Sequence, residues 1–450
     1  MSTVRTWALA ALWAGAAACA TPGQTQLSDS VPAFTSRANH GAEAAADEAT
    51  LGEHPTLAAI LRLARGRNPE LLAARARAEA AYARVAGAGR LPDLELKTEL
   101  WGAPLARPWA VDQADTIMIG VRQAFPAPGA RAADAVAATE EARAAAAGLQ
   151  AMELDVVRDV EQAWAAYVLA ERALVIHRGH IEVATQLVDV ASSLIASGRA
   201  TQDDVLRMDL ERARLHGDVV GFERDRRTAA VKLNALMGRQ PSAALGPPPE
   251  DAPAPAQVPA LAHVEQLALE RRPELVAATH GVRAGQARAD ARRRESSWPS
   301  FMVGADYWLM PGGPVTHGYG LMLAINLPWL NGARADALRI AETEIRAAES
   351  DATAVRTRIL AEVGEAHAGV DAARSSLAIV ETDLMPRAQR AFESTRTSFA
   401  TGRGSTLAVL DALRALLDLR MERAAARVAL DLAWAELERA AGGPLAEVQP

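Results

Sequence analysis

The motif Asn68-Pro69-Glu70-Leu71 recurs later in the chain as Arg272-Pro273-Glu274-Leu275. Further motifs recur in the same order, and their offset stays between 202 and 207 residues. They are Leu91-Pro92 and Trp298-Pro299, Phe125-Pro126 and Leu327-Pro328, Gly129-Ala130-Arg131 and Gly332-Ala333-Arg334, and Ala196-Ser197-Gly198-Arg199 and Ala400-Thr401-Gly402-Arg403. A steady offset across so many motifs indicates one structural unit present twice. We therefore predict a first structural repeat over 51–245, a linker over 246–260 and a second repeat over 261–450.

Each repeat contains one very long segment that favours a helix. Residues 131–197 contain no proline, and residues 334–401 are interrupted only by Gly364, Gly369 and Pro386. Apolar residues recur at steps of three and four along both segments, as in a coiled-coil seam. Gly198 and Gly402 are predicted to end these helices, and further helices over about 202–237 and 405–441 then fold back. The prediction is two long helical hairpins.

Between each pair of prolines lie two short segments that favour strands. Residues 94–101 alternate Leu or Thr with charged residues and Trp, and 117–122, 301–308 and 319–326 also alternate. Each segment has about the length that crosses a bilayer as a tilted strand. More than half of the aromatic residues after residue 18 fall within 92–126 and 298–330, as expected for a membrane-interface girdle. The predicted interface aromatics are Trp101, Trp109, Trp298, Trp308 and Trp329. A soluble hairpin core beneath the helices is the alternative.

The amino-terminal residues resemble an export signal. Residues 1–18 hold one charge, Arg5, followed by an apolar run that ends in small residues, which predicts a signal peptide over 1–18. Cys19 is the only cysteine, and its position directly after Ala18 is similar to a bacterial lipoprotein box. We predict lipidation of Cys19, the alternative being an ordinary cleavage site. Residues 19–50 are predicted to form an extended amino-terminal tether.

Composition excludes several function classes. The net charge of -7 is mild and the charges are mixed, so no basic face indicates a nucleic-acid partner. The HExxH, CxxC, GxSxG and Walker motifs are absent from the sequence, so no enzyme activity, cofactor or metal site is predicted. His177 and His180 have the spacing of a metal pair, but His177 falls in the apolar seam, which favours a packed histidine.

In its order of elements the chain resembles the TolC-type outer-membrane efflux channel family, over nearly all of 51–445. The resemblance depends on the duplicated Pro-Glu-Leu, the strand pairs bounded by prolines, and the turn Phe399-Ala400-Thr401-Gly402-Arg403 that leads to Val409-Leu410-Asp411-Ala412. It implies a mainly α fold with a small β part. Long α-helical hairpins form a trimeric α-barrel, and four strands per chain contribute to a 12-stranded outer-membrane β-barrel.

The resemblance also implies which residues close the periplasmic end. In the family a Tyr, an Arg and two Asp near the second tip serve there. Asp411 matches one Asp, while Phe399, Gly404 and Ala408 replace the other three. Arg199, Arg403, Asp203 and Asp204 at the two turns are further gate candidates. The alternative is that all five are solvated tip charges.

The expected function is a passive outer-membrane channel of a tripartite efflux pump. The implied partners are two further copies in a homotrimer, a periplasmic adaptor protein, an inner-membrane transporter and outer-membrane lipid. The expected location is the outer membrane of a Gram-negative bacterium, with extension into the periplasm. Metal cations and drugs both remain open as cargo. The alternatives are a soluble periplasmic coiled-coil scaffold and the outer-membrane channel of a type I protein secretion system.

Overall fold

The computed structural model describes residues 47–103, 105–107, 111–249, 257–311, 316–330 and 332–445. The predicted signal peptide, Cys19, most of the predicted tether and Trp109 lie outside these residues. The chain forms two compact units, and each draws on both sequence repeats. The sheet unit comprises Ala76–Gly148 and Glu274–Val355, and the hairpin unit comprises Leu149–Pro273, Arg356–Pro450 and the residues before Ala76 that the structure describes.

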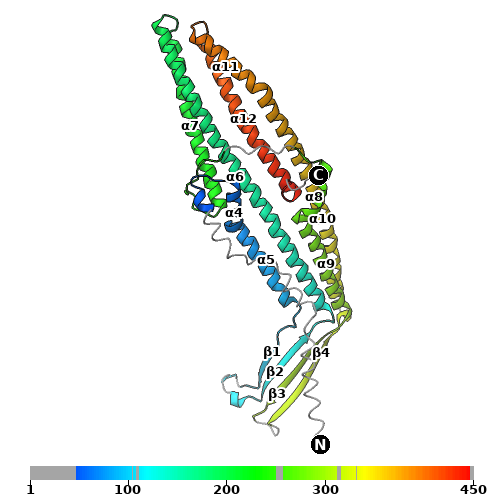
Figure 1. Cartoon of the computed structure of the whole chain (residues 1–450). Helices are drawn as coiled ribbons and strands as arrows, with labels where there is room; N and C mark the ends of the chain where they lie inside the picture. Colours follow the sequence, from blue (N-terminus) through cyan, green and yellow to red (C-terminus); the bar gives the residue numbers. More distant parts are fainter. Residues whose placement is uncertain are drawn as a thin grey trace. The chain divides into compact units, whose positions relative to one another are not determined.

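The sheet unit holds four antiparallel strands in the order β1-β2-β3-β4 (Figure 1). The strands are β1 Glu95–Trp101, β2 Thr116–Phe125, β3 Ser300–Leu309 and β4 His317–Asn326. One row across the sheet reads Leu96, Val121, Ala305 and Leu321, so side chains of like character fall on the same face. This register confirms the alternation predicted from the sequence. It leaves β1 and β4 as the edge strands of the described sheet.

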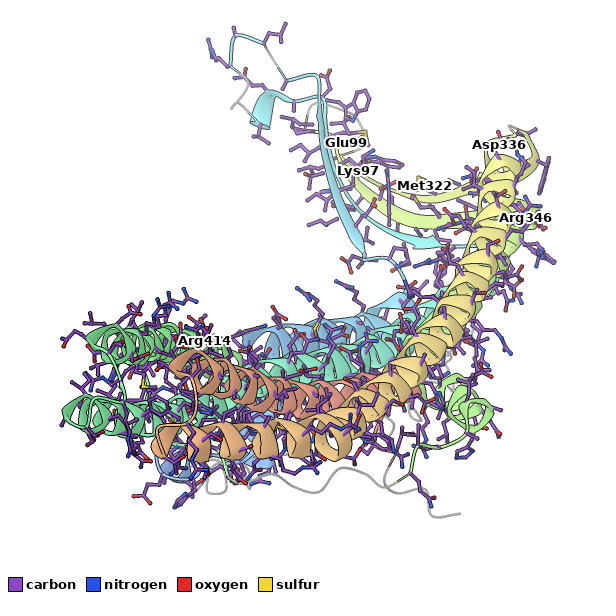
Figure 2. All side chains as sticks on the ribbon, turned by 90° about the horizontal axis from the view of Figure 1, so that it is seen from above. Lys97, Glu99, Met322, Asp336, Arg346 and Arg414 are labelled. Carbon is purple, nitrogen blue, oxygen red and sulfur yellow. The ribbon has the colours of Figure 1, made fainter. Side chains whose placement is uncertain are left out.

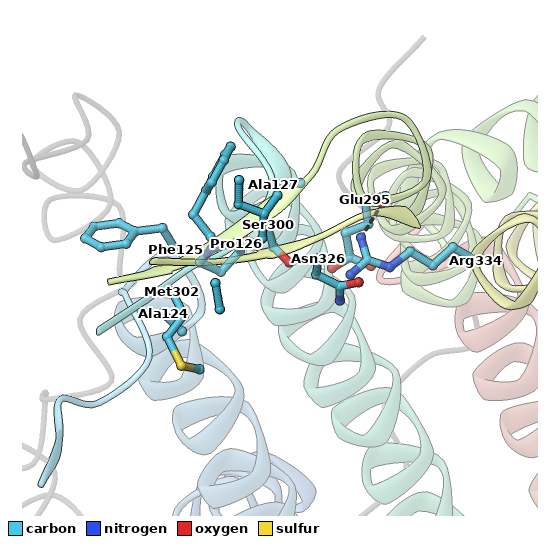
Figure 3. Close-up of a pocket in the computed structure, with 12 residues that line it drawn as sticks. Ala124, Phe125, Pro126, Ala127, Glu295, Ser300, Met302, Asn326 and Arg334 are labelled. Atoms are coloured by element: carbon cyan, nitrogen blue, oxygen red, sulfur yellow. Dashed lines mark hydrogen bonds between the residues drawn. The ribbon is translucent and has the colours of Figure 1, made fainter. Parts of the chain in front are cut away.

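Helices enter and leave the sheet through two equivalent junctions. α5 (Pro69–Ala88) leads to β1, and α6 (Ala130–Ala196) follows β2. In the second repeat α9 (Pro273–Ser297) leads to β3, and α10 (Ala333–Ile379) follows β4. Arg131 Nη1 donates to the Gly89 carbonyl at 3.3 Å, and Arg334 Nη1 donates to the Glu295 carbonyl at 2.6 Å (Figure 3). Each arginine thus binds the carboxyl end of the helix before its strand pair, where carbonyl groups favour a cation.

The hairpin unit is built from helices that turn back at glycine. α6 runs unbroken for 67 residues and is followed by α7 (Gln202–Leu236), while α11 (Met385–Ala400) is followed by α12 (Thr406–Ala441). Gly198 and Gly402 both have φ +70, which a side chain would oppose, so glycine suits both turns. α4 (Leu57–Arg67) and α8 (Leu261–Arg271) are the short helices of the two repeats. The predicted helical hairpins are confirmed.

The second long helix differs from the first near its end. α10 passes through Gly369 without a break and gives way to a π-helical turn, η4 (Val380–Leu384), directly before α11. Pro386 lies in the first turn of α11 and has no N–H to donate to the carbonyl four residues earlier, which accounts for the local change of pitch. Both glycines of the segment, Gly364 and Gly369, lie within the unbroken α10, so only the proline alters the helix.

Two apolar clusters hold the hairpin unit together. One lies between α4, α6 and α7 and includes Ile60, Val160 and Leu233. The other joins both hairpins near their turns and includes Leu187, Phe399 and Val409. His177 and His180 are buried and each ring contacts a backbone carbonyl of its own helix, at 3.0 and 2.9 Å, as predicted for packed histidines. Among the described helices, none combines the length and the apolar character needed to cross a bilayer.

The residue before each Pro-Glu-Leu motif binds the end of a returning helix. Asn68 Nδ2 donates to the Leu236 carbonyl at 3.0 Å, and Asn68 Oδ1 accepts from two backbone amides of α5. Arg272, at the equivalent position, donates to the Ala440 carbonyl at 3.4 Å and to Glu362 Oε2 at 2.8 Å. Both side chains are 2% exposed. The two repeats therefore make the same contact with different chemical groups.

Candidate functional site

One face of the four-stranded sheet is apolar and exposed. On β4, Leu321 at the centre of the strand is 84% exposed, and Tyr319 near its start is 85% exposed. The same face also carries Leu96, Leu100, Ile119, Val121, Val303, Tyr307, Leu323 and Ile325, all exposed. Apolar patches that cover a whole sheet face mark contact with a membrane or with another protein.

The opposite face carries charges. Lys97 and Glu99 form an ion pair on β1, and Arg122 Nη2 lies 3.8 Å from Asp306 Oδ1 between β2 and β3. Lys97, Glu99 and Met322 project from this side of the sheet (Figure 2). A sheet with one apolar and one charged face suits a boundary between lipid and water.

The predicted interface aromatics separate into two groups. Trp298 precedes β3 and Trp329 follows β4, and both are exposed. A pocket lined in part by Phe125, Ser300 and Asn326 lies at these same ends of the strands (Figure 3). Trp101 lies at the far end of β1 in register with the charged face. Trp308 also belongs to the charged face, where its indole covers Gly320. Trp101 and Trp308 thus share the charged face, and a membrane-interface role for the five tryptophans stays a prediction.

The two helical turns contact one another within the hairpin unit. The Arg199 side chain lies against Gly402, where an added Cβ would be 2.7 Å from Arg199 Cδ. Arg199 and Arg403 are both exposed. Gly402 therefore has two roles: it adopts the positive φ of its own turn, and it leaves room for the Arg199 side chain of the first hairpin.

Asp204 has a different role from the other gate candidates. Its carboxylate accepts from the Thr201 amide at 2.8 Å and from the Thr201 hydroxyl at 2.7 Å, which caps α7. A hydrogen bond from Thr406, then those from Thr201, lower the pKa of Asp204. Asp204 thus links the start of α7 to the start of α12.

Asp203 and Asp411 keep much of their exposure. Asp203 pairs with Arg207 at 2.6 Å, and Asp411 is 62% exposed with Arg414 at 4.0 Å. The stronger partner of Arg414 is Glu211, at 2.5 Å and 8% exposed, and Arg414 lowers the pKa of that carboxyl. The sequence offered no signal for this pair, because its members lie 203 residues apart on helices whose packing had to be known first.

A second carboxyl, on α6, has an altered pKa. Burial, followed by the negative charges of Glu438 and Glu436, raises the pKa of Glu161 to about 7. Among the described residues there is no group of three side chains placed to hold a metal ion. Glu161 is therefore a titrating group near neutral pH rather than part of a described metal site.

Comparison with known proteins identifies the family. The family model described as outer membrane efflux protein matches twice, over residues 60–239 and 264–443. No curated protein matches the sequence.

Solved outer-membrane proteins share the fold. CusC has a TM-score of 0.74 at 19% identity, with 86% of this chain and 92% of that chain covered. VceC from Vibrio cholerae has a TM-score of 0.71 at 19% identity, covering 86% and 96%. The MtrE outer membrane channel of Neisseria gonorrhoeae, in its open state, has a TM-score of 0.70 at 18% identity, covering 86% and 89%. Because the two family matches span most of the sequence, the chain belongs to the outer membrane efflux protein family and is an outer-membrane channel component of an efflux pump.

Proposed function

We propose that three copies of the chain form a passive export duct that works with a periplasmic adaptor and an inner-membrane transporter. The observation that carries this proposal is the four-stranded sheet with one exposed apolar face and two free edges. Edge strands in lipid leave backbone N–H and C=O groups without partners, so the sheet must be extended by other chains. When several chains join their strands into one closed sheet, these backbone groups form hydrogen bonds with the neighbouring chain.

The strand order suits such a closure. The strands alternate in direction, so β4 of one copy and β1 of the next run antiparallel and can form a regular ladder. Three copies supply twelve strands. The apolar face then contacts lipid, while Glu95, Lys97, Glu99, Arg122 and Asp306 line a wet interior.

The apolar face also discriminates between the alternatives. A periplasmic coiled-coil scaffold would place the exposed Leu and Tyr side chains of β4 in water, at a cost of about 25 cal/mol for each Å² of apolar surface. A type I secretion channel would use the same duct with another inner-membrane partner. Metal cations and drugs both fit a polar interior, and the partner transporter would choose between them.

Disulfide crosslinking tests the closure. In a Cys19→Ser background, Thr98→Cys on β1 is combined in turn with Leu321→Cys, Leu323→Cys or Ile325→Cys on β4. At least one pair should give covalent dimers and trimers in native membranes. The control replaces Thr98→Cys with Ile119→Cys on β2, because a strand then separates the two cysteines beyond disulfide reach. Failure of all three β1–β4 pairs in correctly localised protein would contradict the duct.

Three copies also bring the charges at the hairpin turns into rings. Asp411 and Asp203 keep exposed carboxylates, so their rings favour cations and repel one another on closure. Arg199 and Arg403 supply the opposing charge. We expect Asp411→Ala with Asp203→Ala to weaken cation selectivity in planar bilayers. Asp204→Ala, the matched control, should lower stability instead, since Asp204 is a helix cap. If Asp411→Ala with Asp203→Ala leaves the cation selectivity unchanged, these residues are solvated tip charges without a role in the gate.

The amino terminus adds an anchor to this arrangement. Cys19 follows the predicted signal peptide and is acylated in this proposal, which holds the tether at the inner leaflet of the outer membrane. One acyl chain gives modest membrane affinity, so it assists a protein that the strands already retain.

A further inference from the structure

The methionines of the sheet all lie on its charged face. They are Met118 on β2, Met302 on β3, Met310 directly after β3, and Met322 on β4. Met310 keeps the register of β3, because its N–H donates to the Thr316 carbonyl at 3.1 Å. Methionine is an apolar residue, so hydrophobicity alone would place it on the apolar face. Its restriction to the charged face therefore needs another reason.

Met302 and Met322 form one diagonal pair, across β3 and β4. Met302 lies opposite Ala324, which is two residues after Met322. The Met322 methyl group reaches across to β3, since a Cβ at Gly304 would be 3.3 Å from Met322 Cε. Diagonal neighbours on one face of a sheet are about 7 to 8 Å apart, a separation that long side chains span. The two thioethers can therefore bind one ion between them.

Met118 and Met310 form the other diagonal pair, across β2 and β3. Met118 is 6% exposed and lies opposite Trp308, which is two residues before Met310. The side chains of Trp308 and Met310 meet over Gly318, where a Cβ would be 3.5 Å from Trp308 Cε3 and 3.7 Å from Met310 Cε. This pair thus lies beside an indole, and the face of an indole attracts cations.

We propose that each methionine pair is a binding site for a soft monovalent cation, such as Cu⁺ or Ag⁺, on the wall of the duct. Thioether sulfur is a soft, uncharged ligand that selects such ions over those that prefer oxygen or nitrogen. Among the described residues, His, Cys, Asp and Glu side chains form no group of three placed to hold a metal ion, so a harder ion has no comparable site there.

The pairs suit an ion in transit. Two thioethers without a thiolate hold the ion loosely enough for it to leave again, as passage requires. The inference rests on the proposed function, because the charged face lines the interior only in a closed barrel. It names soft metal ions as a class of cargo that this interior recognises.

The competing explanation is that these methionines only fill space beside glycine. Leucine separates the two explanations, because a Met→Leu exchange nearly conserves volume and apolar character but removes the sulfur. Packing alone predicts that leucine leaves ion binding unchanged.

The experiment measures the Ag⁺ bound to the purified protein by equilibrium dialysis in chloride-free buffer. Ag⁺ is the probe because it is soft, like Cu⁺, and stays monovalent in air. All variants carry Cys19→Ser, because a cysteine sulfur also binds soft cations. We expect Met302→Leu with Met322→Leu, and Met118→Leu with Met310→Leu, each to lose about one Ag⁺ per chain.

Single substitutions test the pairing. Met322→Leu alone should lose the ion of its pair, and Met310→Leu alone the ion of the other, because two sulfurs share each ion. The matched control is Met152→Leu with Met385→Leu, on α6 and α11, which should bind as much Ag⁺ as the parent protein. Excess Zn²⁺ should not displace the bound Ag⁺.

Thermal unfolding identifies the variants that remain folded, and if a paired variant does not fold, its single variants decide the same question. Unchanged Ag⁺ binding after replacement of all four methionines overturns the inference, and retention of the ion by a single variant contradicts a shared site. Protein that binds Ag⁺ through these methionines but conducts no ions in planar bilayers overturns the proposed duct instead.

Discussion

Leu321→Arg should strongly destabilise the protein in a membrane, and its cost can be derived from the structure. β4 has ten residues and Leu321 is the fifth. At about 3.4 Å per residue and a tilt of about 40°, the strand rises about 26 Å, which matches the apolar band of a membrane barrel. Leu321 therefore lies near the midplane, and its 84% exposure directs it into lipid. An arginine there costs about 2 to 4 kcal/mol in each copy.

Met322→Arg is the matched control, because Met322 has almost the same depth and lies on the charged face (Figure 2). Both variants are refolded from urea into large unilamellar vesicles, and the free energy of unfolding is measured by tryptophan fluorescence. We expect Leu321→Arg to lose about 2 to 4 kcal/mol per copy, and Met322→Arg to lose much less. Equal losses, or a larger loss in Met322→Arg, would refute the assignment of the two faces.

Three further predictions concern the helices and the amino terminus. Glu211→Gln should cost about 1 to 3 kcal/mol at pH 7, because it removes the carboxylate that accepts the short hydrogen bond from Arg414. The pKa of Glu211 is lowered in the folded state, so the cost of Glu211→Gln is present above the unfolded pKa and disappears as the pH falls through the folded pKa. Thermal unfolding of the wild type and the variant should therefore differ more at pH 7 than at pH 3. Glu161→Gln should stabilise the protein at pH 8 and have little effect at pH 4, since a pKa raised to about 7 makes the folded state less stable as pH rises above the unfolded value; an equal effect at both pH values would refute the shift. Cys19→Ser should abolish labelling by a radioactive fatty acid while much of the protein stays membrane-bound, and an unlabelled wild type would disprove lipidation.

The strands and hairpins could be predicted because their signals are local. Alternation at period two assigned the residues of each strand to faces, and glycine marked both turns. The same alternation grouped Trp308 with Asp306 and so indicated the charged face, whereas the count of aromatics near strand ends indicated lipid. The register supports the first signal. The period of two therefore predicts the face of an aromatic residue, which its distance to a strand end does not.

The gate candidates show where sequence reasoning reaches its limit. Thr201 precedes Asp204 by three residues, a spacing typical of a helix cap, so the capping role had a local signal. The hydrogen bond from Thr406 to Asp204 and the pair of Glu211 with Arg414 depend on how two hairpins pack. Contacts of this kind arise between segments far apart in the chain, and side-chain spacing carries no information about them.

The contacts of Asn68 and Arg272 bear on the history of the duplication. An ancestral single repeat would have used one residue in this place, and its copies would have been interchangeable. Asn68 now needs only a carbonyl and two amides, whereas a buried Arg272 needs the carboxylate of Glu362 as well. A chain made of two first repeats would place an asparagine at both positions and need no carboxylate there, whereas one made of two second repeats would bury a second guanidinium, which needs a carboxylate of its own. The two positions are therefore no longer interchangeable, because an exchange of Asn68 and Arg272 would separate the guanidinium from Glu362.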